Sequence, residues 1–474
     1  MILLLMLCSQ IIPLDDEANT TLERLEIKGI VCGLPASTPF TAKDIVFSNT
    51  DTAKLRPGSV DYFDVQRIFA PTPETKFAPL LQLKGTGASF NLGGALQASY
   101  RYRDTLSAGL DIKYYGNIGS AVSFYATHRL TFAANWPDSV FDAHSWRGNE
   151  RPVFAEIPDA VINIDAFKWL SLQLGRCQMQ YGPVPEGGLM LSTQPWGLDH
   201  ASYSLKWKKL SLTTMYAWLE QNKRMVSHRF EYVAQKWKLG LTEAVVSSDT
   251  NEVLPYILAP AAFYYFMQWN KGQDENILWS LDASLILSPF KIYGELLVDD
   301  FAYEPETGPH KIGSTIGAKW VSVFNSEIDA NLDYTFITKW TYAQRHDKQN
   351  YTFRERILGD DLGPDADRTR LIFSYRPLPR LTVGLKGFYK RHGEGDVWRD
   401  FADDGAHDRE SFHPPFPSGV VEHHLGSEAS LKYMFWGRSF VVLKAKAVRI
   451  QNLAHQENNN VFRPLIQTDL HWEF

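Results

Sequence analysis

Cysteine is scarce in this chain, with three among 474 residues, at positions 8, 32 and 177. The count is odd and the spacing is not that of a metal-binding cluster, so we expect neither a metal site nor a cofactor. From residue 11 onward the chain also lacks any apolar run of the roughly 18 residues that a membrane-spanning helix needs. With a mean hydropathy of −0.25 and 22% charged residues, this excludes a bundle of transmembrane helices.

Blocks of basic residues are missing too. The net charge is only −6 and no basic block accompanies it, so nucleic acid is not an expected partner. The chain contains no G-x-S-x-G or H-E-x-x-H motif, and therefore no signature of a nucleophile or a metallohydrolase. We expect a protein that is not an enzyme.

Aromatic residues are what the chain has in excess. Phe, Tyr and Trp make up 13% of it, with 28 Phe, 21 Tyr and 14 Trp, which is rich for a soluble protein. A β-barrel in a lipid bilayer uses such residues in girdles at its two membrane interfaces. The composition therefore fits one large barrel, although the length alone would also allow three soluble domains.

The last ten residues, 465–474, alternate like a β-strand with two different faces. One side carries Ile466, Thr468, Leu470, Trp472 and Phe474. The other side carries Gln467, Asp469, His471 and Glu473. A terminal aromatic on a strand that is apolar outside and polar inside is typical of the closing strand of a bacterial outer-membrane barrel. The alternative is the edge strand of a soluble sheet.

The same alternation recurs in several long segments, among them residues 277–287, 291–300, 329–336 and 381–390. We expect a single closed barrel in which the polar side of each strand faces the inside. The predicted lipid-facing set is Leu281, Ala283, Leu296, Val298, Leu470, Trp472 and Phe474. The predicted inward set includes Asp282, Glu295 and Asp469.

The lengths of the connections give an independent test. If each strand reverses direction, the connections on one side of the barrel are all short. The other side receives the long ones, at residues 135–151, 179–199, 247–275, 341–365 and 393–421. Short periplasmic turns and long outer loops are the outer-membrane arrangement. The fold class is therefore all-β, a transmembrane antiparallel β-barrel of about 18 strands, formed by residues 77–474.

The N-terminal residues do not alternate. Residues 1–14 are interpreted as the remnant of a signal-like segment. Residues 15–76 are predicted to form a small helical periplasmic plug, with Thr20 and Glu23 as a capping box and Gly29 as the helix stop. A disordered leader is the alternative. We prefer the plug, because Leu22, Leu25 and the apolar residues after them need a surface to cover them.

Short motifs occur in a fixed order along nearly the whole chain. They are residues 25–30 (L-E-I-K-G-I), 39–41 (P-F-T), 174–176 (L-G-R), 181–183 (Y-G-P), 188–192 (G-L-M-L-S), 227–230 (S-H-R-F), 240–243 (G-L-T-E), 293–301 (Y-G-E-L-L-V-D-D-F), 358–359 (L-G), 362–367 (L-G-P-D-A-D) and 418–422 (S-G-V-V-E). In their shared order these motifs resemble those of the Wzi-type capsule assembly proteins of the bacterial outer membrane. Tyr181 stands where the family has Trp, and Val184 where it has a second Gly.

This resemblance implies a barrel of about 18 strands with a periplasmic helical plug. It also implies a lectin-like role, in which the protein holds capsular or related polysaccharide on the outer surface. We therefore expect a monomer in the bacterial outer membrane, with polysaccharide and membrane lipid as partners. The resemblance carries over no residue-level binding site, because the outer loops are where relatives diverge.

The candidate polysaccharide-binding residues come from the chemistry of the outer loops. Sugar faces stack on flat aromatic rings, and planar guanidinium groups can hold hydroxyls or carboxylates with two hydrogen bonds. The candidates are Trp136, Trp196, Arg345, Trp398 and Arg399. The alternative is that the aromatic residues belong to the girdle and that the arginines pair with nearby aspartates.

Two other functions remain open. The runner-up is a polysaccharide or sugar porin whose lumen conducts. A hydrolase is the third possibility, because Glu295 and Asp299 share one side of a strand, and glycoside hydrolases use a pair of carboxylates. We expect instead that such carboxylates form ion pairs across the lumen, with Arg176, Arg229, Lys386 and Lys444 as candidate partners.

Overall fold

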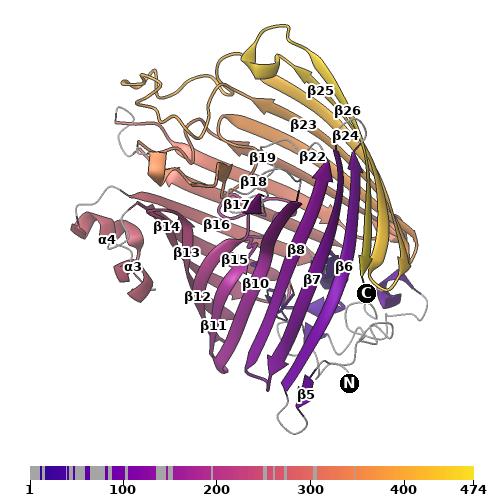
Figure 1. The fold of residues 1–474 in the computed structure, drawn as a ribbon. Helices are drawn as coiled ribbons and strands as arrows, with labels where there is room; N and C mark the ends of the chain where they lie inside the picture. Colours follow the sequence, from indigo (N-terminus) through magenta and orange to yellow (C-terminus); the bar gives the residue numbers. More distant parts are fainter. Residues whose placement is uncertain are drawn as a thin grey trace.

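The computed structural model describes residues 11–12, 17–38, 40–41, 46–47, 59–63, 81–83, 88–101, 105–134, 146–147, 153–193, 196–248, 254–259, 262–271, 275–302, 307–345 and 347–473. All structural statements concern these residues. Eighteen long strands form one closed antiparallel barrel, as the alternation predicted (Figure 1). The barrel closes where the last strand pairs with the first long one, with Leu470 opposite Ala98 and Glu473 opposite Ala95.

The barrel strands follow one another around the wall in sequence order. They are β6 (Ala88–Arg101), β7 (Thr105–Ile118), β8 (Val122–Ala134), β10 (Val153–Phe167), β11 (Leu170–Cys177), β12 (Leu198–Trp207), β13 (Leu210–Glu220), β14 (Lys223–Val233), β15 (Trp237–Ser247), β16 (Asn276–Leu287), β17 (Phe290–Asp300), β18 (Lys311–Trp320), β19 (Ile328–Ile337), β22 (Ala366–Leu378), β23 (Leu381–His392), β24 (Glu422–Trp436), β25 (Ser439–Gln451) and β26 (Val461–Glu473). Two short strands, β5 (Leu81–Leu83) and β9 (Trp146–Arg147), pair with the edges of β6 and β10.

The register confirms which side chains face outward. Leu281, Leu296 and Trp472 are 52%, 43% and 45% exposed on the outer face, whereas Asp282 and Glu295 are buried inside the barrel. Ala283, Val298 and Leu470 also lie on the outer face, whereas Asp469 points inward and accepts a hydrogen bond from Ser99. Phe474 lies outside the described residues.

The two ends of the barrel differ, as the lengths of the connections predicted. One end carries only short turns, at residues 119–121, 168–169, 208–209, 234–236, 288–289, 321–327, 379–380 and 437–438. The other end carries the long loops that precede β10, β12, β16, β22 and β24. We call these the short-turn end and the long-loop end.

The N-terminal helix α1 (Glu17–Ile27) is present, with Leu22, Leu25 and Ile27 fully buried. Gly29 ends it in the left-handed conformation, with φ of 76°, as predicted. The capping box was placed wrongly: the helix begins at Glu17, one turn earlier, so Thr20 lies inside it. The division of the chain at residues 14 and 76 stays a prediction.

The remaining elements are short. Near α1, β1 (Ile11–Ile12) pairs with β3 (Phe40–Thr41) and β2 (Val31–Cys32) with β4 (Val46–Phe47). The loop before β22 contains the hairpin β20 (Thr352–Phe353) and β21 (Arg356–Ile357), and the loop before β16 contains α3 (Leu254–Leu258) and α4 (Tyr264–Lys271). Three 3-10 turns are η5 (Val323–Asn325), η6 (Asp347–Gln349) and η7 (Leu453–His455). In the described part of the chain, no helix has the length and apolar character to cross a bilayer.

The helices α3 and α4 pack against the outside of the wall (Figure 1). Tyr256 and Tyr264 from these helices form a buried cluster with Val226, Val245 and Ile277, which point outward from β14, β15 and β16. The long-loop segment between β15 and β16 therefore covers part of the outer face of the wall.

Candidate functional site

A loop from the long-loop end fills part of the lumen. After Cys177 the chain leaves the wall, and residues 178–193 and 196–197 form what we call the inner loop before β12 begins. Leu189, Met190 and Leu191 of this loop are fully buried. They belong to a large apolar cluster whose other members include Tyr342, Tyr351, Phe353, Leu358 and Leu362 from the loop before β22. The barrel thus encloses a hydrophobic core shared by its loops and by the inner face of its wall.

Glu295 holds the backbone of the inner loop. Its carboxylate accepts hydrogen bonds from the amides of Leu189 and Met190, at 2.8 and 3.0 Å. From the other side, the hydroxyl of Tyr342 donates to the Leu189 carbonyl at 2.6 Å, and that of Tyr351 to the Met190 carbonyl at 2.8 Å. The carboxylate suggested as a catalytic group therefore has a structural role that occupies both of its oxygens.

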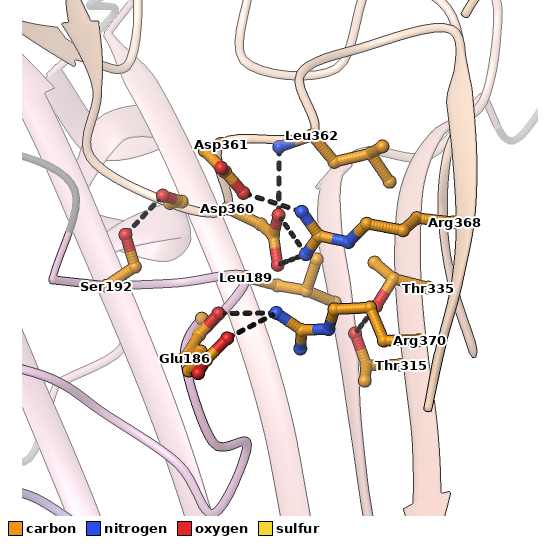
Figure 2. A network of polar contacts seen from close by, with 12 residues as sticks. Glu186, Leu189, Ser192, Thr315, Thr335, Asp360, Asp361, Leu362, Arg368 and Arg370 are labelled. Atoms are coloured by element: carbon orange, nitrogen blue, oxygen red, sulfur yellow. Dashed lines mark hydrogen bonds and ion pairs between the residues drawn. The ribbon is translucent and has the colours of Figure 1, made fainter. Parts of the chain in front are cut away.

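Two arginines of β22 hold the inner loop and the adjacent loop before β22 (Figure 2). Arg368 donates to both oxygens of Asp360, at 2.9 and 3.0 Å, and Arg370 donates to the Glu186 carbonyl at 2.8 Å. The Ser192 hydroxyl donates to the Gly359 carbonyl at 2.5 Å. Figure 2 shows Arg368 and Arg370 reaching from their strand toward Asp360 and Glu186. Burial raises the pKa of Asp360 to about 6, although Arg368 acts in the opposite direction.

The helix α1 is fixed at the short-turn end by ion pairs with the inner face of the wall. Glu23 pairs with Lys291 and Lys319, at 2.5 Å each, and Glu26 pairs with Lys238 at 2.6 Å. Burial favours the neutral form of Glu23, but the two lysines outweigh this and hold its pKa well below the usual range. The charges of α1 therefore match those of the strands that surround it.

Other contacts of the N-terminal segment extend this attachment into the lumen. Arg24 donates to Asp329 at 2.8 Å and to Glu327 at 2.9 Å. Further along, Thr38 and Gln180 exchange backbone hydrogen bonds of 3.0 and 3.1 Å. Because Gln180 belongs to the inner loop, the N-terminal segment and the inner loop meet inside the barrel and obstruct it together.

The expected ion pairs within the lumen are present in part. Arg229 donates to both oxygens of Asp282, at 2.6 and 3.0 Å, and Lys444 lies 3.6 Å from Asp469. Lys386 pairs with Glu186 of the inner loop. Arg176 was placed wrongly, because its neighbour Cys177 takes the inward position and the Arg176 side chain points outward.

At the long-loop end, two candidate binding residues, Arg345 and Arg399, contact the segment of residues 401–404, and Trp398 is the chain neighbour of Arg399. We call Arg345, Trp398, Arg399, Phe401 and Asp404 the loop cluster; it joins the loop before β22 to the loop before β24. The Arg345 guanidinium lies 5.6 Å from the centre of the Phe401 ring. Arg399 lies 3.8 Å from the Asp404 carboxylate, which also accepts a hydrogen bond from the Trp340 ring at 2.9 Å.

The loop cluster is open to solvent. Trp398 is 46% exposed, the side chain of Arg399 is 63% exposed, and Arg345 is exposed as well. Lys311 pairs with Asp400 at 3.0 Å and lies 5.5 Å from the Phe401 ring centre, so β18 is in contact with this part of the loop. An exposed indole and two exposed guanidinium groups at the same end of the barrel are suited to sugar rings and their hydroxyls.

The other two candidates lie elsewhere. Trp196 is half-buried in the inner loop, with the Arg356 guanidinium 4.3 Å from its ring centre. Trp136 lies outside the described residues. The sequence reasoning missed Phe401 and Arg356. Phe401 could have been found as an aromatic residue close to Trp398 in the same loop, whereas nothing in the sequence brings Arg356 to Trp196.

The fold and this arrangement define a class: an 18-stranded antiparallel barrel with an obstructed lumen. Within that class the chain has the fold of Wzi of Escherichia coli, an outer-membrane protein involved in group 1 capsule assembly and described as a carbohydrate-binding β-barrel. The similarity covers 98% of this chain and 100% of Wzi, with a TM-score of 0.63 and 11% sequence identity.

Two Pseudomonas aeruginosa barrels are similar at a lower level. OprD matches over 81% of this chain and 95% of its own, with 10% identity and a TM-score of 0.45. OccD3 (OpdP) matches over 84% and 95%, with 12% identity and a TM-score of 0.48. No family model matches the sequence, and no curated protein does.

Proposed function

We propose that this protein is a bacterial outer-membrane barrel that binds surface polysaccharide and takes part in the assembly or attachment of a capsule or exopolysaccharide, as a monomer and without catalysis. In this proposal the short-turn end faces the periplasm and the long-loop end faces the cell exterior. The single observation that carries it is the exposed group of Arg345, Trp398 and Arg399 on a barrel with the fold of Wzi.

The obstructed lumen supports binding over conduction. The inner loop is held by Glu295 and by Arg370 of β22, and the N-terminal segment meets it through Thr38 and Gln180. A polymer or a sugar would have to displace several buried hydrogen bonds to pass. This favours a role at the outer surface over the porin alternative.

The occupied carboxylates support a role without catalysis. Both oxygens of Glu295 accept backbone hydrogen bonds, and Asp299 accepts one from the amide of Tyr342 at 2.6 Å. A general acid or base needs an oxygen within hydrogen-bond reach of the substrate. These two residues are instead directed at the protein's own loops.

The test is a binding measurement with purified protein and candidate capsular polymers. We expect Trp398→Ala and Arg399→Ala to weaken binding about ten-fold or more each, since a stacked aromatic or a charge-assisted hydrogen bond contributes about 1.5 kcal/mol. Trp169→Ala is the matched control, because Trp169 is also an exposed indole but lies in a turn at the short-turn end.

The length of the polymer is measured in the same samples. Equal binding by wild type and both loop variants would remove the loop cluster from the proposal. Polymer that becomes shorter with wild type but stays intact with Glu295→Gln would replace binding with hydrolysis.

A further inference from the structure

Polar side chains on the outer face of a transmembrane barrel need an explanation, because a charge that meets lipid near the bilayer centre costs about 2–4 kcal/mol. One such group lies on β14 and β15, where His228 and Glu243 are paired across the strands and face outward. Both are buried under α3 and α4, and the Glu243 carboxylate accepts hydrogen bonds from the amides of Tyr264 and Tyr265, at 2.7 and 3.0 Å. The chain itself shields this group from lipid.

A second outward-facing group lies on β11 and β12. Arg176 and Asp199 are opposite each other in the register, and Trp218 of β13 is opposite Asp199 on the same face. The Arg176 guanidinium donates two hydrogen bonds to the Asp199 carboxylate, at 2.7 and 2.6 Å. Leu174, two residues before Arg176, is 57% exposed, which confirms the outward direction.

The wall is indented beside this ion pair. Strand β11 ends at Cys177 and β12 begins at Leu198, because the inner loop between them enters the lumen. Strand β10 extends further toward the long-loop end, so its residues 153–159 have no partner on β11. A cavity of about 740 Å³ lies at this step in the wall, which we call the notch. Its lining includes Glu156, Ile157, Leu174, Arg176, Asp199 and Trp218.

The backbone around the notch is built for close approach. Gly175 has a φ of 140°, and a Cβ atom there would lie 1.9 Å from the Ala160 carbonyl oxygen. A Cβ atom at Gly197 would lie 2.7 Å from the Pro158 carbonyl oxygen. These contacts keep β10, β11 and the start of β12 tightly packed below the notch, so its shape is fixed by the backbone.

The charges in the notch are balanced. On the outer face the Arg176 guanidinium is already paired with the Asp199 carboxylate, so the notch offers hydrogen-bond donors and acceptors side by side. Behind it, on the lumen face of the wall, Arg129 donates to Asp111 at 2.8 and 3.0 Å and lies 3.4 Å from Glu156. Such paired groups suit the hydroxyls of a sugar, which both donate and accept, better than they suit a phosphate. Trp218, 40% exposed, adds a flat apolar surface for a sugar ring.

We infer that the notch binds the sugar headgroup of a glycolipid in the leaflet at the long-loop end. Trp218 lies two residues before the end of β13 at that side, and Arg176 is the second-last residue of β11, so the notch is at the level where headgroups meet the barrel. The apolar part of the lining, Leu174 and Ile157, continues the lipid-facing surface. The inference goes beyond polymer binding at the loop cluster, although it shares the assumption that the barrel spans the outer membrane.

The test uses the full chain in phospholipid nanodiscs prepared with and without purified rough-type lipopolysaccharide. After mild detergent extraction, native mass spectrometry measures the fraction of protein that retains the glycolipid. We expect wild type to retain it, and the double variant Arg176→Ala with Asp199→Ala to retain about ten-fold less, the factor that one charge-assisted hydrogen bond supplies. Trp218→Leu, which keeps the ion pair, should also reduce retention.

The matched control is the double variant Arg391→Ala with Asp367→Ala. These residues form another outward cross-strand ion pair, on β22 and β23, and do not line the notch. Retention that is equal in wild type and both notch variants would overturn the inference. Loss of retention in the control pair to the same extent would overturn it too, because the effect would then be one of surface charge.

A competition separates the two possible sources of the sugar. Lipid-free core oligosaccharide from the same lipopolysaccharide should not displace the retained glycolipid, because the apolar lining also contributes. Displacement at millimolar oligosaccharide would assign the notch to free saccharide and overturn the glycolipid. Polymer binding to the loop cluster is measured in parallel: the notch variants should keep it, so failure of this inference is distinct from failure of the proposed function.

Discussion

Replacement of Glu295 by alanine tests how the inner loop is held. Two amides, those of Leu189 and Met190, lose their acceptor in a fully buried place. A buried donor that loses its partner costs about 1–3 kcal/mol, so the loss of the acceptor for both amides should destabilise the closed inner loop by about 3 kcal/mol or more. Hydrogen exchange at these two amides should then become about 150-fold faster, because the loop opens locally more often.

The companion variant Glu295→Gln should have a smaller effect. Its amide group keeps one carbonyl oxygen that can accept from one of the two amides, so we expect about 1 kcal/mol and roughly five-fold faster exchange. Ser284→Ala is the control, because Ser284 is also buried and its hydroxyl has no hydrogen-bond partner within the described structure. Unchanged exchange in Glu295→Ala would refute the reasoning that this carboxylate holds the inner loop.

Three further predictions concern the N-terminal helix, the loop cluster and the outer helices. The lysine partners of Glu23 hold its pKa low in the folded protein. The ion pairs of Glu23 therefore stabilise the docked α1 fully above about pH 4.3, and this stabilisation is lost only as the pH falls through the lowered pKa. Protection of α1 from protease should be unchanged between pH 7 and pH 5 and should fall in stronger acid. For an acidic polymer, the loss of binding affinity caused by Arg345→Ala should shrink as salt rises, because exposed charges are screened within roughly 10 Å at 0.1 M. The loss of affinity caused by Trp398→Ala should persist. An equal salt dependence of the two losses would contradict this. Glu243→Ala removes the acceptor at the start of α4, and cleavage by added protease within residues 248–275 should become faster than in wild type.

Much of the barrel could be predicted from the sequence, because each strand has two different environments. The alternation of Leu281 and Asp282, or of Leu470 and Asp469, follows directly from an apolar outer face and a polar inner face. The lengths of the connections then fixed the two ends. These features are local, so a single sequence contains them.

The loop conformations could not be predicted in the same way. The apolar run Leu189–Met190–Leu191 indicates burial, but not that the partner is the lumen core with Tyr342 and Tyr351. The outward position of Arg176, by contrast, follows from its place two residues after the outward-facing Leu174, so the alternation did contain that signal. The group of Arg345, Trp398 and Arg399 was predicted only as separate residues, because two loops far apart in sequence build it around Phe401.

The most direct test of the central claim, that this barrel acts at its surface rather than as a channel, is the planar-bilayer conductance of the purified full chain beside that of a chain lacking residues 15–64. The inner loop and the N-terminal segment meet at Thr38 and Gln180, so the full chain should show no steady conductance. Deletion of residues 15–64 removes the contacts of Glu23, Arg24 and Glu26 and should produce or raise channel openings. A steady open channel in the full chain, unchanged by the deletion, would contradict the account and favour a porin.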